Sequence, residues 1–190
     1  MRVGRIITFV LFLFLVVSCK NRYSIEETVK KLSGKKIEID FSRTVRTDTV
    51  GVDSEVYPLG GVKLVFSFDD ECVSCFNNQI AVCENYLDRF NNDNLSILCI
   101  VPFTKEKALE VAGDLNCHTN IYLVYNDDKY YEKRNHLEEY NSFFKSFLLG
   151  EDNKVILVGN PLRSPKLKTL FDKTIHDMEG ETGNYDGKTE

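Results

Sequence analysis

Two cysteines separated by a valine and a serine are the part of this 190-residue sequence most suited to chemistry. At the start of a helix, the spacing of Cys72 and Cys75 brings both sulfurs within reach of a disulfide bond and turns the first toward solvent. A mostly apolar run at 62–68 and three acidic residues ending at Glu71 come directly before them. The two cysteines are therefore predicted to lie where a buried strand gives way to a helix.

Three kinds of site are compatible with this spacing. In an exported protein, Cys72 and Cys75 could exchange with disulfides of other proteins, or they could form a disulfide that only stabilises the fold. They could also supply half of a zinc site, with Cys117 and His118 as the remaining ligands. The spacing of those two residues differs from that of a zinc ribbon or finger. We therefore expect redox chemistry with an electron partner, and no bound cofactor or metal.

The other cysteines are sorted by their surroundings. Cys99 lies in the apolar run 95–101, which is typical of a buried strand, and Cys117 is interpreted as a structural residue at the start of another strand. Cys83 belongs to a series with helical spacing, so it is predicted to face the core; the series is Phe76, Ile80, Cys83, Leu87 and Phe90.

The first residues have the layout of a secretory signal. Arg2 and Arg5 precede an apolar run at 9–17, which is too short to span a bilayer comfortably, and Cys19 follows closely. Removal of 18 residues would leave 172 of the 190, which suits one domain with a hydrophobic core, and would move the net charge from −5 to −7. This charge disfavours nucleic acid and anionic membrane surfaces as partners.

The sequence Val-Val-Ser-Cys at 16–19 resembles the lipobox of bacterial lipoproteins. The resemblance implies that residues 1–18 are a lipoprotein signal peptide and that lipid on Cys19 anchors the protein in the bacterial cell envelope. Residues 20–24 lack the acidic run that sends some lipoproteins to the cell surface, so we expect an anchor that faces the periplasm. An ordinary signal peptide and an uncleaved anchor are the alternatives.

Hydrophobic periodicity predicts a succession of strands and helices. Strands 62–68 and 95–101 enclose one helix, so they should be parallel, whereas strands 146–149 and 155–158 flank a turn and should form an antiparallel hairpin. The other predicted elements are a helix at 24–33, a strand at 37–41, a loop or weak edge strand at 42–60, a helix at 104–115, a strand at 121–125, a short helix with loop at 126–141, and a helix from Ser164 through Ile175.

This order, with Cys-x-x-Cys at a helix start and a hairpin before the closing helix, resembles the thioredoxin fold and, more closely, its TlpA-like envelope branch. The resemblance implies an α/β fold of three layers, a central mixed sheet flanked by helices. It places the thioredoxin-like domain at 61–178. Residues 19–60 would form a lipidated N-terminus with a short helix, strand and loop, and residues 179–190 a disordered tail.

The family resemblance also implies a function, a thiol-disulfide oxidoreductase that exchanges with protein disulfides and depends on an unidentified electron donor. Cys72 would be the attacking sulfur and Cys75 the resolving one. A helix start at this point is expected to lower the pKa of the Cys72 thiol. The acidic residues 69–71 oppose this effect, which predicts slow attack and a low reduction potential.

Three features of the family are missing, and they motivate a second hypothesis. Glu71 replaces the tryptophan that usually precedes the first cysteine, and Phe144 lies where the substrate-docking cis-proline is expected. Phe66 occupies the position of a buried carboxylate that shuttles protons in some relatives, and Glu71 is the nearest substitute. The alternative is a non-catalytic binding or structural module on the same scaffold. Peroxidase chemistry is disfavoured because the proline and threonine of peroxiredoxins do not precede Cys72.

Overall fold

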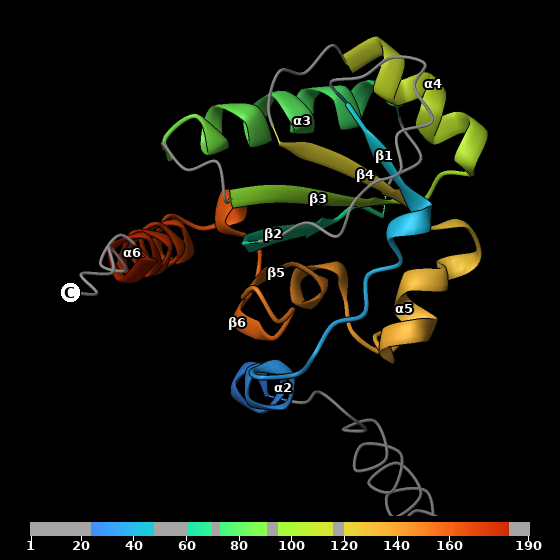
Figure 1. Ribbon diagram of the computed structural model, residues 1–190. Helices are drawn as coiled ribbons and strands as arrows, with labels where there is room; N and C mark the ends of the chain where they lie inside the picture. Colours follow the sequence, from blue (N-terminus) through green and yellow to red (C-terminus); the bar gives the residue numbers. More distant parts are fainter. Residues whose placement is uncertain (1–23, 48–60, 70–72, 91–94, 116–119, 183–190) are drawn as a thin grey trace, which may run out of the picture. The chain divides into compact units, whose positions relative to one another are not determined.

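The computed structural model describes residues 24–47, 61–69, 73–90, 95–115 and 120–182 (Figure 1). The chain divides into two compact units, Met1–Lys31 and Leu32–Glu190, and the sheet belongs to the second. The described helices are α2 (Ile25–Leu32), α3 (Val73–Leu87), α4 (Lys105–Leu115), α5 (Tyr130–Asn135) and α6 (Pro165–Thr182). Short 3-10 helices are η1 (Phe41–Arg43), η2 (Asp127–Lys129), η3 (Ser142–Lys145) and η4 (Pro161–Arg163).

The described residues form one mixed sheet in the order β1-β4-β3-β2-β5-β6. Strands β2, β3 and β4 are mutually parallel, and the pairs β1–β4, β2–β5 and β5–β6 are antiparallel. The strands are β1 (Thr44–Arg46), β2 (Val62–Ser67), β3 (Leu95–Val101), β4 (Ile121–Tyr125), β5 (Phe147–Leu149) and β6 (Val155–Val158). The predicted parallel pair and the predicted hairpin are both confirmed.

Both faces of the central strands are buried. Leu64 and Phe66 of β2 point into a core that includes residues of α3, α4 and α6, and Cys83 and Cys99 are fully buried there, as predicted. Val65 points to the opposite face. Figure 1 shows α5 on the other side of the sheet from α3 and α4. The result is a three-layer α/β arrangement, which explains why these strands have continuous apolar sequences rather than alternating ones.

The structure differs from the sequence prediction in the segment before the sheet. No strand forms at 37–41; the side chain of Ile37 is fully buried, but its N–H donates to the carbonyl of Asn153 in the β5–β6 turn. Asp40 then ends the extended backbone by accepting hydrogen bonds from the N–H and hydroxyl of Ser42, which starts η1. The edge strand forms at β1 instead, within the predicted 42–60 segment.

The two predicted terminal helices are present. Ser24 caps α2, since its hydroxyl accepts from the Glu27 N–H at 3.2 Å and Glu27 accepts in return from the Ser24 N–H. Helix α6 follows Ser164 and continues to Thr182, past Ile175, the last residue of the predicted helix, and past the predicted domain boundary at 178. Residues 179–182, which were predicted to belong to a disordered tail, are therefore helical. A single glycine at 180 costs a helix only about 1 kcal/mol, so it does not stop α6. Residues 183–190 lie outside the described residues.

A lysine is buried at the beginning of the central strand. Lys63 is 1% exposed, and its ammonium group donates to the carbonyls of Gly61 at 2.9 Å and Glu151 at 3.5 Å. Burial lowers the pKa of Lys63 below its ordinary value, because the charged form loses water, although the charges of Glu151 and Asp152 act in the opposite direction.

Lys63→Met should change how stability depends on pH. Between the lowered pKa of Lys63 and its ordinary value of 10.5, the unfolded chain binds more protons than the folded protein, so the free energy of unfolding rises with pH. Urea unfolding of both proteins, from neutral pH to about pH 10, measures this. We expect the wild type to gain stability relative to Lys63→Met as pH rises. A constant difference would contradict a lowered pKa of Lys63 in the folded protein.

Candidate functional site

The predicted junction between strand and helix is confirmed. Strand β2 ends at Ser67, and α3 begins at Val73, the residue that follows Cys72 in the sequence. Cys75 is the third residue of α3. Glu71 and Cys72, the side chain of Cys75, and the predicted residues Cys19, Cys117 and His118 lie outside the described residues. Phe144 is the predicted site residue whose side chain is described.

Phe144 lies in η3, at the same edge of the sheet as the end of β2. Strand β5 begins just after η3 and runs antiparallel to β2, with Val65 opposite Phe147. The Ser67 N–H donates to the hydroxyl of Ser146 at 3.3 Å, which joins the two segments directly. The ring of Phe144 is half-buried and lies edge-to-face against that of Phe143, with 5.2 Å between ring centroids. The described residues contain no cis peptide bond.

Aromatic rings fill the space beneath the start of α3. Phe76, in its second turn, packs edge-to-face against Phe68 at 5.2 Å and against Phe103 at 5.7 Å between centroids. Phe66 contacts Phe68 at 6.5 Å and is fully buried. Phe66, the position at which the predicted resemblance would place a carboxylate, is thus part of the apolar core. It can exclude water from the helix start, but it cannot transfer a proton.

Two oppositely charged side chains are buried together at this edge of the sheet, and sequence reasoning did not find them. Lys145 of η3 and Glu132 of α5 have 10% and 5% of their side-chain surface exposed, and Lys145 Nζ lies 3.4 Å from Glu132 Oε1. The Asn126 amide donates to Glu132 Oε2 at 2.7 Å. We call Glu132 and Lys145 the edge ion pair.

The edge ion pair is fixed to the ends of the parallel strands. Asn126 follows β4, and its backbone N–H donates to the Val101 carbonyl at the end of β3 at 2.9 Å. Its side-chain oxygen accepts from the Tyr131 N–H at 2.7 Å. Burial, with a smaller contribution from the Glu132 charge, raises the pKa of Tyr131, so this phenol stays neutral. The hydroxyl of Tyr131 has no hydrogen-bond partner among the described residues.

Two further interactions hold the surrounding elements. The Arg43 guanidinium stacks between the rings of Tyr125 and Tyr130, at 4.5 and 4.4 Å from their centroids, and it also forms an ion pair with Asp127. These contacts fasten η1 to the start of α5. On the other face, the Tyr86 hydroxyl of α3 donates to Asp172 of α6 at 2.8 Å.

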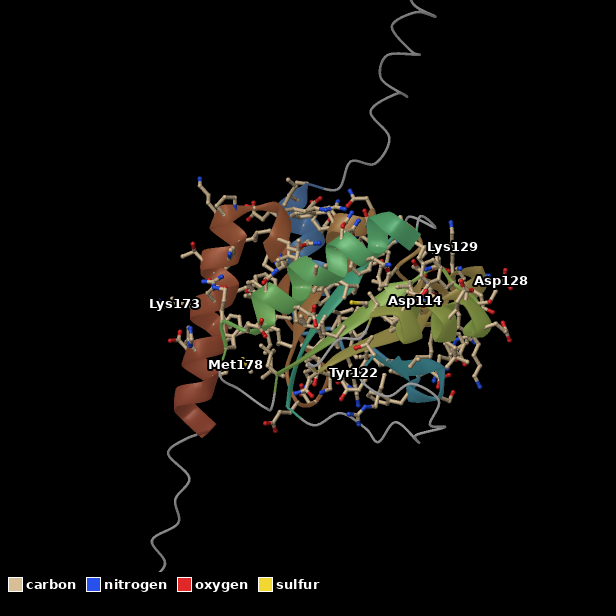
Figure 2. The ribbon with its side chains drawn as sticks, turned by 90° about the horizontal axis from the view of Figure 1, so that it is seen from above. Asp114, Tyr122, Asp128, Lys129, Lys173 and Met178 are labelled. Atoms are coloured by element: carbon tan, nitrogen blue, oxygen red, sulfur yellow. The ribbon has the colours of Figure 1, made fainter. Side chains whose placement is uncertain are left out.

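The C-terminal end of α3 is therefore fastened to α6, which Figure 2 shows crossing the direction of α3, with Lys173 on the side remote from Asp128. Burial and the hydrogen bond to Asp172 raise the pKa of Tyr86, so this bond persists in alkaline solution.

No metal site is found within the described ranges, where no three His, Cys, Asp or Glu side chains gather in a way that could hold an ion. In the same ranges, no helix is both long enough and apolar enough to cross a membrane.

Comparison with solved structures identifies the architecture. No protein-family model matches the chain, and no curated protein matches it in sequence. The mitochondrial 2-Cys peroxiredoxin of Plasmodium falciparum is similar over 78% of this chain and 98% of its own, with a TM-score of 0.51 and 17% identity. The fold is thioredoxin-like.

Two other solved structures are more distantly similar. The reduced 2-Cys peroxiredoxin of Plasmodium vivax is 15% identical over 78% of this chain and 85% of its own, with a TM-score of 0.46. AhpC of Mycobacterium tuberculosis is 14% identical over 61% of this chain and 75% of its own, with a TM-score of 0.44. The narrower TlpA-like assignment stays a prediction from the sequence.

Replacing one member of the edge ion pair should destabilise the protein. Lys145→Met leaves the buried Glu132 carboxylate without its cation, and we expect the free energy of unfolding to fall by about 3 kcal/mol. Adding Glu132→Gln removes that charge while keeping an acceptor for Asn126, and should restore most of the loss. Denaturant unfolding of the two single variants and the double variant measures the coupling. A double variant no more stable than Lys145→Met would contradict a direct interaction.

Proposed function

We propose that this protein is a thiol-disulfide oxidoreductase in which Cys72 and Cys75 form the reactive dithiol. The observation that carries the proposal is the start of α3 at Val73, directly after Cys72 in the sequence, where the parallel strand β2 has ended within a thioredoxin-like sheet. The first turn of a helix has unpaired N–H groups and a positive dipole end, and both favour a thiolate.

The proposed reaction has two steps. The Cys72 thiolate attacks one sulfur of a substrate disulfide, a mixed disulfide forms, and the other substrate sulfur leaves and takes a proton. The Cys75 thiolate then attacks the Cys72 sulfur, which forms the Cys72–Cys75 disulfide and releases the second substrate thiol. The substrate gains two electrons and two protons, and a dithiol reductant in the envelope must return them to this protein.

Charge near the helix start sets the reactivity. Asp69 is exposed just before α3, and Asp70 and Glu71 follow it in the sequence. Negative charge close to a thiol disfavours its thiolate, so it opposes the effect of the helix. This balance supports a reductant that attacks slowly and whose disulfide, once formed, is stable.

The cellular setting belongs to the same proposal. Cleavage before Cys19 and acylation of that residue would tether the protein to a membrane of the bacterial envelope, with its domain facing the periplasm. Disulfides persist in that oxidising compartment, so a tethered dithiol would find substrates there.

Peroxide reduction is a second candidate, because the P. falciparum neighbour is a peroxiredoxin. One thiolate would take an oxygen from hydrogen peroxide to become a sulfenic acid, and the hydroxide that leaves would take a proton to become water. The second thiol would then form the disulfide with loss of another water. The sequence before Cys72 favours disulfide exchange over this reaction. A binding or structural module without catalysis is the third possibility.

Cys72→Ser should abolish reduction of a protein disulfide. The pre-reduced full-length protein, purified in detergent, is mixed with insulin, and the appearance of insulin thiols is followed with excess dithiol as electron donor. The wild type should turn over, Cys72→Ser should react at the rate of the buffer, and Cys75→Ser should accumulate a mixed disulfide visible in non-reducing gels. Consumption of hydrogen peroxide is measured in parallel, and it distinguishes a peroxidase from a thiol-disulfide oxidoreductase. Equal rates for wild type and Cys72→Ser in both assays would contradict both redox activities and would favour the non-catalytic module.

Cys19→Ala should prevent lipid attachment. Cells expressing either protein are fed an alkyne fatty acid, and the immunoprecipitated protein is assayed for label and for intact mass. The wild type should carry label and lack residues 1–18, whereas Cys19→Ala should carry none. Label on both proteins, or on neither, would contradict acylation at Cys19.

A further inference from the structure

Positive charge in this protein is concentrated next to the proposed lipid anchor. Residues 19–36 contain six basic and two acidic side chains, a net charge of +4, so residues 37–190 carry −11. The net charge of −7 that disfavours anionic membrane surfaces is therefore the sum of two segments of opposite sign. The six basic residues are Lys20, Arg22, Lys30, Lys31, Lys35 and Lys36.

Helix α2 lies in the middle of this basic segment. Lys30 and Lys31 are in its last turn and Lys36 follows it in the sequence, and all three side chains are exposed. Glu26 and Glu27 are in the first turn, where the positive end of the helix dipole favours them. These two glutamates offset the two lysines of the helix, so the surplus of positive charge comes from basic residues on both sides of α2 in the sequence.

The apolar face of α2 is exposed at the end that leads to Cys19. Ile25, Val29 and Leu32 lie on this face, because their spacings of four and three residues match the turn of a helix. Leu32 is 1% exposed and Val29 is half-buried, whereas Ile25 is 69% exposed. A single exposed isoleucine is ordinary in a soluble protein, but here it is the described apolar side chain nearest to the proposed anchor in the sequence.

The proposed anchor keeps α2 close to the membrane. Ile25 follows Cys19 by six residues, and even a fully extended chain of that length spans only about 20 Å. Acylation would hold Cys19 at the boundary between acyl chains and headgroups. Tethering over so short a distance makes a second contact with the same membrane intramolecular, so a weak attraction is enough to sustain it.

We propose that α2 and the basic residues around it bind anionic phospholipid headgroups in the membrane that holds the lipid of Cys19, with the Ile25 side chain inserted among them. This inference rests on the proposed acylation of Cys19 and adds a second contact to that anchor. Acyl chains enter any bilayer, whereas lysine and arginine side chains are attracted to an anionic surface. The second contact therefore makes the attachment selective for anionic lipid.

A single tryptophan can report this contact, because the chain contains none. The full-length Ile25→Trp lipoprotein is reconstituted into vesicles of phosphatidylcholine with or without phosphatidylglycerol, at a constant content of lipid brominated on its acyl chains. Bromine quenches indole fluorescence only at close approach. We expect quenching to be about twofold stronger with phosphatidylglycerol. This increase should disappear at 1 M salt, where charges act over only about 3 Å.

Matched variants separate charge from simple exposure. In the Ile25→Trp protein, Lys30→Gln/Lys36→Gln removes two exposed cations and should weaken quenching by the anionic vesicles, whereas Glu26→Gln removes an exposed anion and should strengthen it. Leu109→Trp places the reporter on α4, at a position that is 49% exposed and far from Cys19 in the sequence, and should be quenched less than Ile25→Trp. Thermal unfolding establishes that each variant is folded.

The possible failures are distinguished by the intact mass of the purified protein. If its mass shows no lipid on Cys19, the proposed anchor fails and this inference fails with it. If the protein is lipidated but the Ile25→Trp reporter is quenched equally with and without phosphatidylglycerol, or no more than the Leu109→Trp reporter, only the contact with anionic lipid is overturned. Disulfide exchange is tested separately by the insulin assay, since none of these variants changes a cysteine.

Discussion

The parallel pairing of β2 with β3 is the constraint on which the rest of the structure depends. Both strands are buried along their whole length, so their backbone groups have no water to bond and must pair with neighbouring strands. Two parallel strands need a crossover connection, and α3 lies within the segment that provides it. The start of α3 is consequently held near the edge where β2 ends.

Sequence patterns predicted this framework because it is built from long apolar runs. Strands β3 and β4 occupy the residues expected from their composition, since a run buried on both faces has little ambiguity. The segment 37–41 shows the limit of such patterns. Its alternation predicted a strand, but alternation cannot tell which backbone will pair with the segment, and the N–H of the buried Ile37 donates to the turn of the β5–β6 hairpin.

Only those features of the candidate site that depend on residues close together in the sequence were predictable. The junction between strand and helix follows from residues close together in the sequence, as does the position of Phe144 before the hairpin. Glu132 belongs to a polar stretch that would normally be solvated, and Lys145 is a single charge among apolar residues whose sequence does not show which carboxylate would meet it. The burial of each charge depends on the other charge and on Asn126, and these three residues come from separate segments that the folded structure brings together.

Gly159, which follows β6, is packed closely against side chains from two other segments of the chain. Its backbone conformation suits glycine, and a Cβ there would lie 3.0 Å from Leu167 as well as close to Phe143. Any larger residue would have to displace a helix side chain or an aromatic ring. The bend after β6 is thus constrained by packing against η3 and α6, although it contributes no side chain of its own.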